Sequence, residues 1–170
     1  MPRQVAKIQM PAESRLYAEL GRASFHDAFE SDLRDERLTA VEIALRFLRE
    51  TPAWVEALLA IRNRAVALAG LRDVGRLGAV DERPAAAYAA GDRLSIFNVV
   101  SVSEGELVLA ADDSHLDARI AFLKRRPDRR PRYAVCSLVT THNALGRLYM
   151  LPVGRIHPLI VRQAMRNLEI

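Results

Sequence analysis

The chain has few of the features that would tie it to a membrane, a secretory route or a disulfide framework. It contains a single cysteine, Cys136, which cannot form an internal disulfide, so we expect a reducing, cytoplasmic location. No apolar run approaches the roughly 18 residues that a membrane span needs. The first residues, MPRQVAKIQMPAESR, lack the apolar core of a secretion signal.

Lysine is almost absent, since only Lys7 and Lys124 are lysine among 25 basic residues. This bias toward arginine, together with the many alanines, is typical of a GC-rich bacterial genome. The net charge of +4 is therefore weak support for nucleic-acid binding. The sequence also lacks a glycine-rich phosphate loop, a G-x-S-x-G elbow and paired cysteines, which argues against common nucleotide-binding, hydrolase and zinc classes.

What is present predicts one α+β domain over residues 1–170. After an irregular start, residues 22–33 favour a first strand. Residues 38–50 predict a helix, because Thr39 and Glu42 have the spacing of a capping box. A second amphipathic helix is expected at 51–71, followed by a loop up to residue 91 with a short element near 85–90.

The second half of the chain predicts an antiparallel meander and a last helix. Four apolar, β-branched segments are separated by turn residues: 93–102, 106–111, 115–123 and 132–142. The tail, 143–169, has helical periodicity, but Pro152 and Pro158 should kink or break it.

Three segments have a more specific sequence pattern: PAWVEALLAIRNRAVALAGL, DDSHLDARIAF and HNALGRLYMLPVGRIHPLIVRQAMRNL. Together they resemble a bacterial family described only as a domain of unknown function, within the START-related, birch-allergen-like (SRPBCC) superfamily. The resemblance covers roughly residues 16–168. It implies a helix-grip fold, in which a curved antiparallel sheet wraps around a long C-terminal helix and leaves a ligand cavity between them. It implies no catalytic residues. Ala118 stands where the family more often has an aromatic residue. The smaller side chain either enlarges the cavity or reduces a packing contact.

The DDSHLD stretch raises the question of a metal or acid–base site. On a strand, Asp113, His115 and Asp117 would share one face with Cα atoms about 6.5 Å apart. However, Asp-Asp-Ser is ordinary turn chemistry, and no third or fourth ligand stands at a recognisable spacing. The turn is the favoured interpretation, and no metal or cofactor is expected.

Two other features invite a functional interpretation. Cys136 and His142 could form a nucleophile–base pair, but six residues along a strand separate them by about 20 Å. The segment 124–132 is the most basic in the chain and could meet phosphates or an anionic membrane surface. It contains no aromatic residue for base stacking, so a solvated hairpin tip is favoured and nucleic acid is not the expected partner.

The favoured function is non-catalytic binding of an apolar or amphipathic small molecule between sheet and C-terminal helix. The candidate cavity residues are Trp54, Arg62, Phe97, Asn98, His115, Asp117, Arg119, Tyr149 and His157. A small enzyme using His115, His157 or Asp117, and an interaction module using the basic hairpin, are the alternatives. The sequence leaves homodimerisation open.

Overall fold

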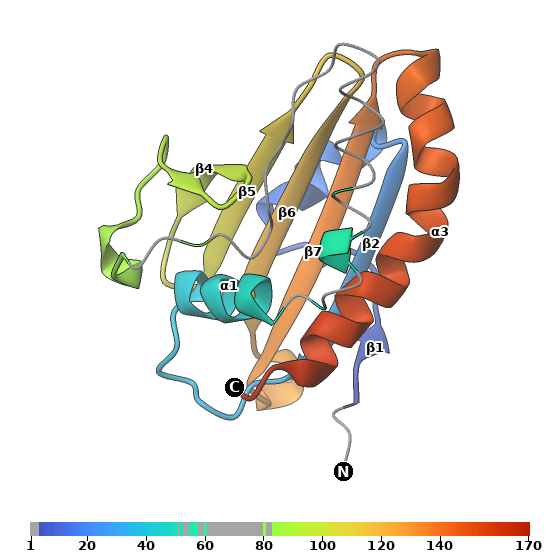
Figure 1. Ribbon diagram of the computed structural model, residues 1–170. Helices are drawn as coiled ribbons and strands as arrows, with labels where there is room; N and C mark the ends of the chain where they lie inside the picture. Colours follow the sequence, from blue (N-terminus) through green and yellow to red (C-terminus); the bar gives the residue numbers. More distant parts are fainter. Residues whose placement is uncertain (1–3, 51, 53–54, 58–59, 61–79, 81–82) are drawn as a thin grey trace.

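The computed structural model describes residues 4–50, 52, 55–57, 60, 80 and 83–170. Its centre is a seven-stranded antiparallel sheet with the strand order β1-β2-β7-β6-β5-β4-β3. The strands are β1 (Ala6–Lys7), β2 (Phe25–Asp32), β3 (Arg93–Leu94), β4 (Phe97–Val102), β5 (Glu106–Asp112), β6 (Leu116–Arg125) and β7 (Arg132–Thr141). The described helices are α1 (Ala40–Arg49) and α3 (Ala144–Asn167), with short 3₁₀ helices η1 (Arg15–Arg22), η2 (Ala85–Ala87) and η3 (Pro127–Arg129). Helices α1 and α3 lie on the same face of the sheet (Figure 1).

The sheet joins the beginning of the chain to its end. The predicted meander is confirmed, because β4 to β7 pair consecutively. The predicted first strand is also confirmed as β2, which pairs with β7 along its whole length, from Phe25 opposite Val139 to Asp32 opposite Arg132. This long-range pairing brings β2 under α3 (Figure 1).

The expectation of one strand over residues 93–102 is wrong. The segment forms two strands, β3 and β4, which pair with each other through Leu94 and Phe97. A tight turn separates them, and Ser95 has a φ of 57° in it. Serine at a left-handed position is uncommon, and the surrounding apolar residues favour the prediction of one continuous strand.

Helix α1 begins as predicted. The Thr39 hydroxyl accepts from the Glu42 amide at 3.2 Å, and the Thr39 amide donates to the Glu42 carboxylate at 2.7 Å. This reciprocal arrangement is the expected capping box. The apolar face of α1 is buried against β5 and β6. The predicted second helix, at 51–71, falls mostly outside the described residues.

Of the two outcomes expected for the prolines of α3, a kink or a break, the break does not occur. The helix runs unbroken over 24 residues with Pro152 and Pro158 inside, and its axis curves (Figure 1). Each proline removes one backbone hydrogen bond, which bends a helix more readily than it ends one when an apolar face is held against a sheet. Asn143 caps the first turn by accepting from the Gly146 amide at 3.0 Å.

The opposite face of the sheet is covered by the segment that was expected to be an irregular start. Helix η1 packs on β6 and β7, and its Leu16 is fully buried in a second apolar cluster. The buried Glu106 carboxylate holds this helix by accepting from the Ser14 hydroxyl at 2.7 Å and the Arg15 amide at 3.0 Å. Because both faces are covered, β7 is buried along most of its length.

This α+β arrangement, with a sheet and a C-terminal helix on one face, is consistent with the expected helix-grip architecture. Among the described residues, no helix combines the length and apolar character needed to cross a membrane.

Candidate functional site

A pocket of about 470 Å³ lies between the sheet, α1 and α3. Strands β6 and β7 supply mostly alternate residues to its wall, because every second side chain points to the same face of a strand; Arg119 of β6 is the exception. The apolar wall is formed by Phe47, Leu48, Val55, Ile96, Phe97, Ala111, Leu116, Ala118, Ile120, Phe122, Val135, Val139, Met150, Val153, Ile160, Val161 and Ala164. Such a volume and an apolar wall are typical of small-molecule sites.

Helix α3 forms one long side of the pocket. Its lining residues recur every three or four positions from Tyr149 through Val153 and His157 to Ala164. At 1.5 Å per residue this stretch spans about 22 Å of helix. The pocket is therefore elongated, and its wall includes the edge-to-face pair of Phe47 and Phe122, with ring centroids 5.2 Å apart.

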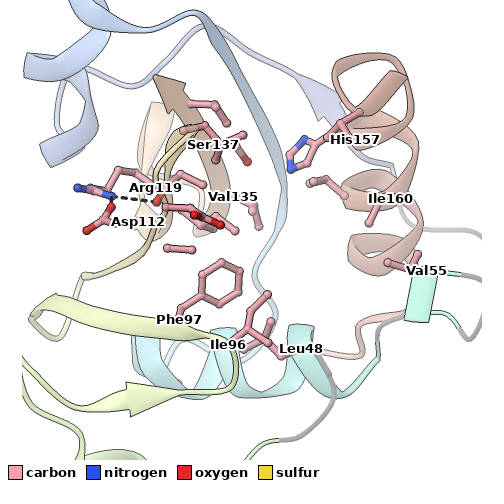
Figure 2. Close-up of a pocket in the computed structure, with 18 of the residues that line it drawn as sticks. Leu48, Val55, Ile96, Phe97, Asp112, Arg119, Val135, Ser137, His157 and Ile160 are labelled. Carbon is pink, nitrogen blue, oxygen red and sulfur yellow. Dashed lines mark hydrogen bonds and ion pairs between the residues drawn. The ribbon is translucent and has the colours of Figure 1, made fainter. Parts of the chain in front are cut away.

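A buried carboxylate stands beside the middle of α3. Asp27, on β2, is only 3% exposed, and its Oδ2 lies 3.0 Å from Nδ1 of His157. The His157 ring projects from α3 toward the sheet, on the side where Ser137 lies (Figure 2). Ser137 is the direct cross-strand neighbour of Asp27. Ser137 and His157 thus line the pocket, and Asp27 is a direct neighbour of each of them.

A second polar group lies near the start of α3. His115 is 1% exposed, its Nδ1 is 3.5 Å from the Asp113 carboxylate, and its ring meets Tyr149 edge-to-face at 5.6 Å. His115, Asp113 and Tyr149 all border the pocket. This group lies where the turn between β5 and β6 contacts the first turns of α3.

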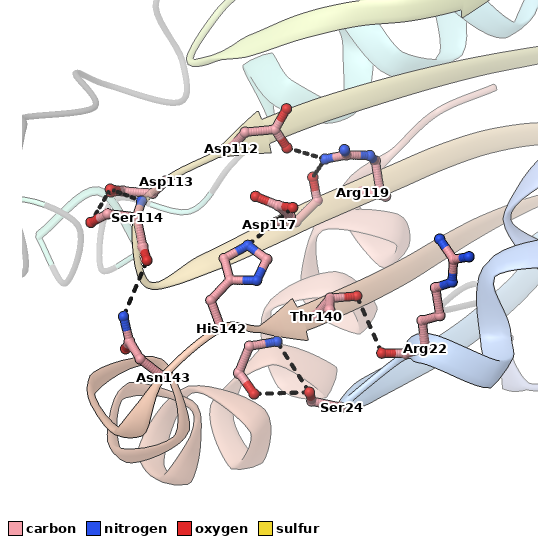
Figure 3. A network of polar contacts seen from close by, with 12 residues as sticks. Arg22, Ser24, Asp112, Asp113, Ser114, Asp117, Arg119, Thr140, His142 and Asn143 are labelled. Atoms are coloured by element: carbon pink, nitrogen blue, oxygen red, sulfur yellow. Dashed lines mark hydrogen bonds and ion pairs between the residues drawn. The ribbon is translucent and has the colours of Figure 1, made fainter.

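The DDSHLD stretch is a turn, as favoured from the sequence. The Asp113 amide donates to the Leu116 carbonyl at 3.0 Å, which closes the β5–β6 connection. Asp117 lies on β6 and pairs with Nε2 of His142 at 3.1 Å (Figure 3). Among the described residues, no group of three or more histidine, cysteine, aspartate or glutamate side chains could hold a metal ion.

The nine candidate cavity residues separate into three sets. The pocket is bordered by Phe97, Asn98, His115, Arg119, Tyr149 and His157. Asp117 is not among the residues that line it, because it alternates onto the other face of β6 from Ala118. The guanidinium of Arg119 is engaged by the Asp112 carboxylate. Trp54 and Arg62 lie outside the described residues.

Sequence reasoning missed Asp27 and Ser137. Both belong to the alternating set of residues on the inward face of their strand. Asp27 stands between Phe25 and Phe29 of β2, and Ser137 stands between Val135 and Val139 of β7. A polar residue within an inward-facing series is the signal that could have identified them.

Cys136 points to the opposite face, into the cluster under η1. Burial raises the pKa of the Cys136 thiol to about 12, and the nearby Glu106 carboxylate acts in the same direction. The thiolate is the nucleophilic form of cysteine, so this environment opposes the nucleophile hypothesis.

The basic segment 124–132 is largely neutralised by carboxylates. Lys124 is near Glu104, and Arg126 pairs with Glu36. The buried Glu30 carboxylate binds Arg125 and Arg132, at 3.2 and 2.6 Å. These ion pairs weaken the case for a phosphate-binding hairpin.

Comparison with known proteins gives a family but no activity. No curated protein and no solved structure matches the chain. A family model matches residues 19–164, which include β2, α1, the meander and most of α3. The chain therefore belongs to the family described as a protein of unknown function, DUF2867.

Proposed function

We propose that this protein binds an apolar or amphipathic small molecule in the pocket between the sheet and α3, without catalysis of its own. The observation that carries the proposal is the elongated, mostly apolar pocket of about 470 Å³ with a few polar groups converging on it. Removal of ligand apolar surface from water would drive binding at about 25 cal/mol per Å². The polar groups would fix the orientation of the ligand. The arrangement of sheet and helix supports membership of the helix-grip superfamily as part of the same proposal.

Native mass spectrometry tests the proposal directly. The protein purified from its expression host should carry an extra mass that is lost on denaturation, or should gain one after incubation with a mixed lipid extract. A persistently unliganded mass under both conditions would contradict the proposal.

A matched pair of substitutions places the ligand in this pocket. Ala118 lines the pocket from β6, so Ala118→Phe would fill part of the space and should abolish the extra mass. Ala86→Phe adds the same ring at an exposed position of η2 and should leave binding unchanged. Circular dichroism would confirm that both variants are folded. Equal ligand loading of the two variants would place the ligand elsewhere.

The Asp27–His157 pair favours a second candidate, a small enzyme. A carboxylate that holds one nitrogen of a histidine orients the imidazole and sets its tautomer, which is a common arrangement of a general base. On this alternative, His157→Gln would abolish turnover of a bound compound while its binding persists. On the favoured proposal, the bound compound is released chemically unchanged from both proteins.

A further inference from the structure

Two buried polar atoms beside His157 have no hydrogen-bond partner among the described residues. They are Oδ1 of Asp27 and the hydroxyl of Ser137, and both residues are 3% exposed. The two residues are directly opposite each other on β2 and β7, so their Cβ atoms lie about 5 Å apart. Ser137 and His157 line the pocket, whereas Asp27 lies behind them.

The buried carboxylate determines what His157 offers to the pocket. An ionised carboxylate only accepts hydrogen bonds, so the Nδ1 of His157, 3.0 Å from Asp27, must carry the proton. In the neutral imidazole the other nitrogen, Nε2, is then an acceptor. Asp27 is thus a positioning residue, because it acts on the pocket through His157.

The adjacent hydroxyl of Ser137 can donate as well as accept. This part of the pocket wall therefore presents an acceptor, Nε2 of His157, and a donor, the Ser137 hydroxyl. Other polar residues also line the pocket, namely Arg93, Asn98, Asp112, Asp113, His115, Arg119 and Tyr149. A ligand hydroxyl group matches both in hydrogen-bond character, since it can donate to an acceptor such as Nε2 and accept from a donor such as the Ser137 hydroxyl. A carboxylate has no proton to donate to Nε2, and the negative charge of Asp27 disfavours it further.

We propose that His157 and Ser137, positioned by Asp27, form the head-group site of the pocket, and that it selects a long-chain alcohol over the matching carboxylate. This inference rests on the proposed function and deepens it by naming the chemical class of the ligand. The apolar chain of the alcohol would lie along α3, against residues such as Val153 and Ile160.

Isothermal titration calorimetry with decanol, decanoate and methyl decanoate tests the selection, because the three ligands share a chain and differ at the head. Decanol should bind about tenfold more tightly than either of the others, which is the order of one hydrogen bond with a buried acceptor. Ser137→Ala should lower the affinity for decanol, because it removes the donor to the ligand oxygen.

The decisive variant is Asp27→Asn. The asparagine amide can donate to Nδ1 of His157, which leaves the proton on Nε2 and makes that nitrogen a donor. The substitution also removes the negative charge, so the preference should shift from decanol toward decanoate. If Asp27 had only a structural role, the substitution would lower the affinities for decanol and decanoate together.

The chain offers a matched control in Asp117→Asn. It makes the same chemical change in another aspartate–histidine pair, Asp117 with His142, which does not line the pocket. The affinities for all three ligands should stay at the wild-type values.

The outcomes separate this inference from the proposed function. If all three ligands bind equally, the pocket is a binding site but the head-group assignment is wrong. If decanoate binds best to the wild-type protein, or if Asp27→Asn leaves the preference unchanged, the assignment is also overturned. If none of the ligands binds and no extra mass is found by native mass spectrometry, the proposed function itself fails.

Discussion

Gly146 offers the sharpest stability test of the junction between α3 and the sheet. A Cβ atom built at this position would lie 2.0 Å from the His115 carbonyl oxygen and 3.3 Å from Cβ of Thr141. The oxygen belongs to the backbone and already accepts from the His142 amide at 3.0 Å, so it cannot move aside like a flexible side chain. Gly146→Ala must therefore displace the first turn of α3 or the β5–β6 turn.

The expected cost follows from this overlap. Overpacking of a close-packed site costs about 1–3 kcal/mol, and a collision with backbone belongs at the upper end of that range. We expect Gly146→Ala to lower the free energy of unfolding by about 2–3 kcal/mol, after any gain in helix propensity. For a chain of this size, that corresponds to a fall in Tm of about 4–12 °C. Thermal unfolding followed by circular dichroism, with urea unfolding as a second measure, would detect it.

Gly154, in the same helix, provides the control. A Cβ atom there would lie 3.4 Å from the Phe25 ring, which is ordinary van der Waals contact. Gly154→Ala should therefore raise stability by about 1 kcal/mol through helix propensity. If the two variants have equal stability, or if Gly146→Ala is not destabilised, α3 does not approach the β5–β6 turn as closely as described.

Three further predictions concern the two faces of the sheet. Thr39→Ala removes the hydroxyl of the α1 capping box and should cost about 1 kcal/mol in urea unfolding. Cys136 should resist alkylation in the native protein and react only on unfolding. Burial raises the pKa of the Cys136 thiol from 9.0 to about 12. The stabilising effect of the neutral thiol is therefore present below pH 9.0 and is lost as the pH rises toward 12. Urea unfolding at alkaline pH would measure this loss of stability. Glu30→Gln removes a buried charge that binds Arg125 and Arg132, and should cost about 1–3 kcal/mol by the same assay.

The parts of the fold that the sequence predicts are those whose signal is local. The capping box of α1, the alternation along β6 and the Asp-Asp-Ser turn each depend on residues within a few positions of one another. The turn at Ser95 was not predicted, because a single serine between apolar residues is a weak turn signal. The local sequence left open whether the prolines kink or break α3, because the outcome depends on packing against β2 and β7. Tertiary contacts outweigh the local effect of the prolines.

The site is less accessible to sequence reasoning because its parts come from distant segments. His157 was a candidate, but its partner Asp27 is 130 residues away and becomes a neighbour only through the pairing of β2 with β7. Asp117 was a candidate for the same reason as His115, since both belong to one short polar stretch. The pleat of β6 directs Asp117 away from the pocket, and which face is inward cannot be read from that stretch alone.

The location of the Asp27–His157 pair argues that it serves the pocket rather than the fold. A buried carboxylate is costly to desolvate, and apolar residues of similar volume commonly stabilise a protein as well or better. The pair of Asp117 and His142 does not face this cost, because both side chains are at least a third exposed. In contrast, the Asp27 side chain is 2% exposed and keeps one oxygen without a partner among the described residues. Folding gains little from such an arrangement, whereas the proposed binding of a polar head group would gain a fixed acceptor at His157.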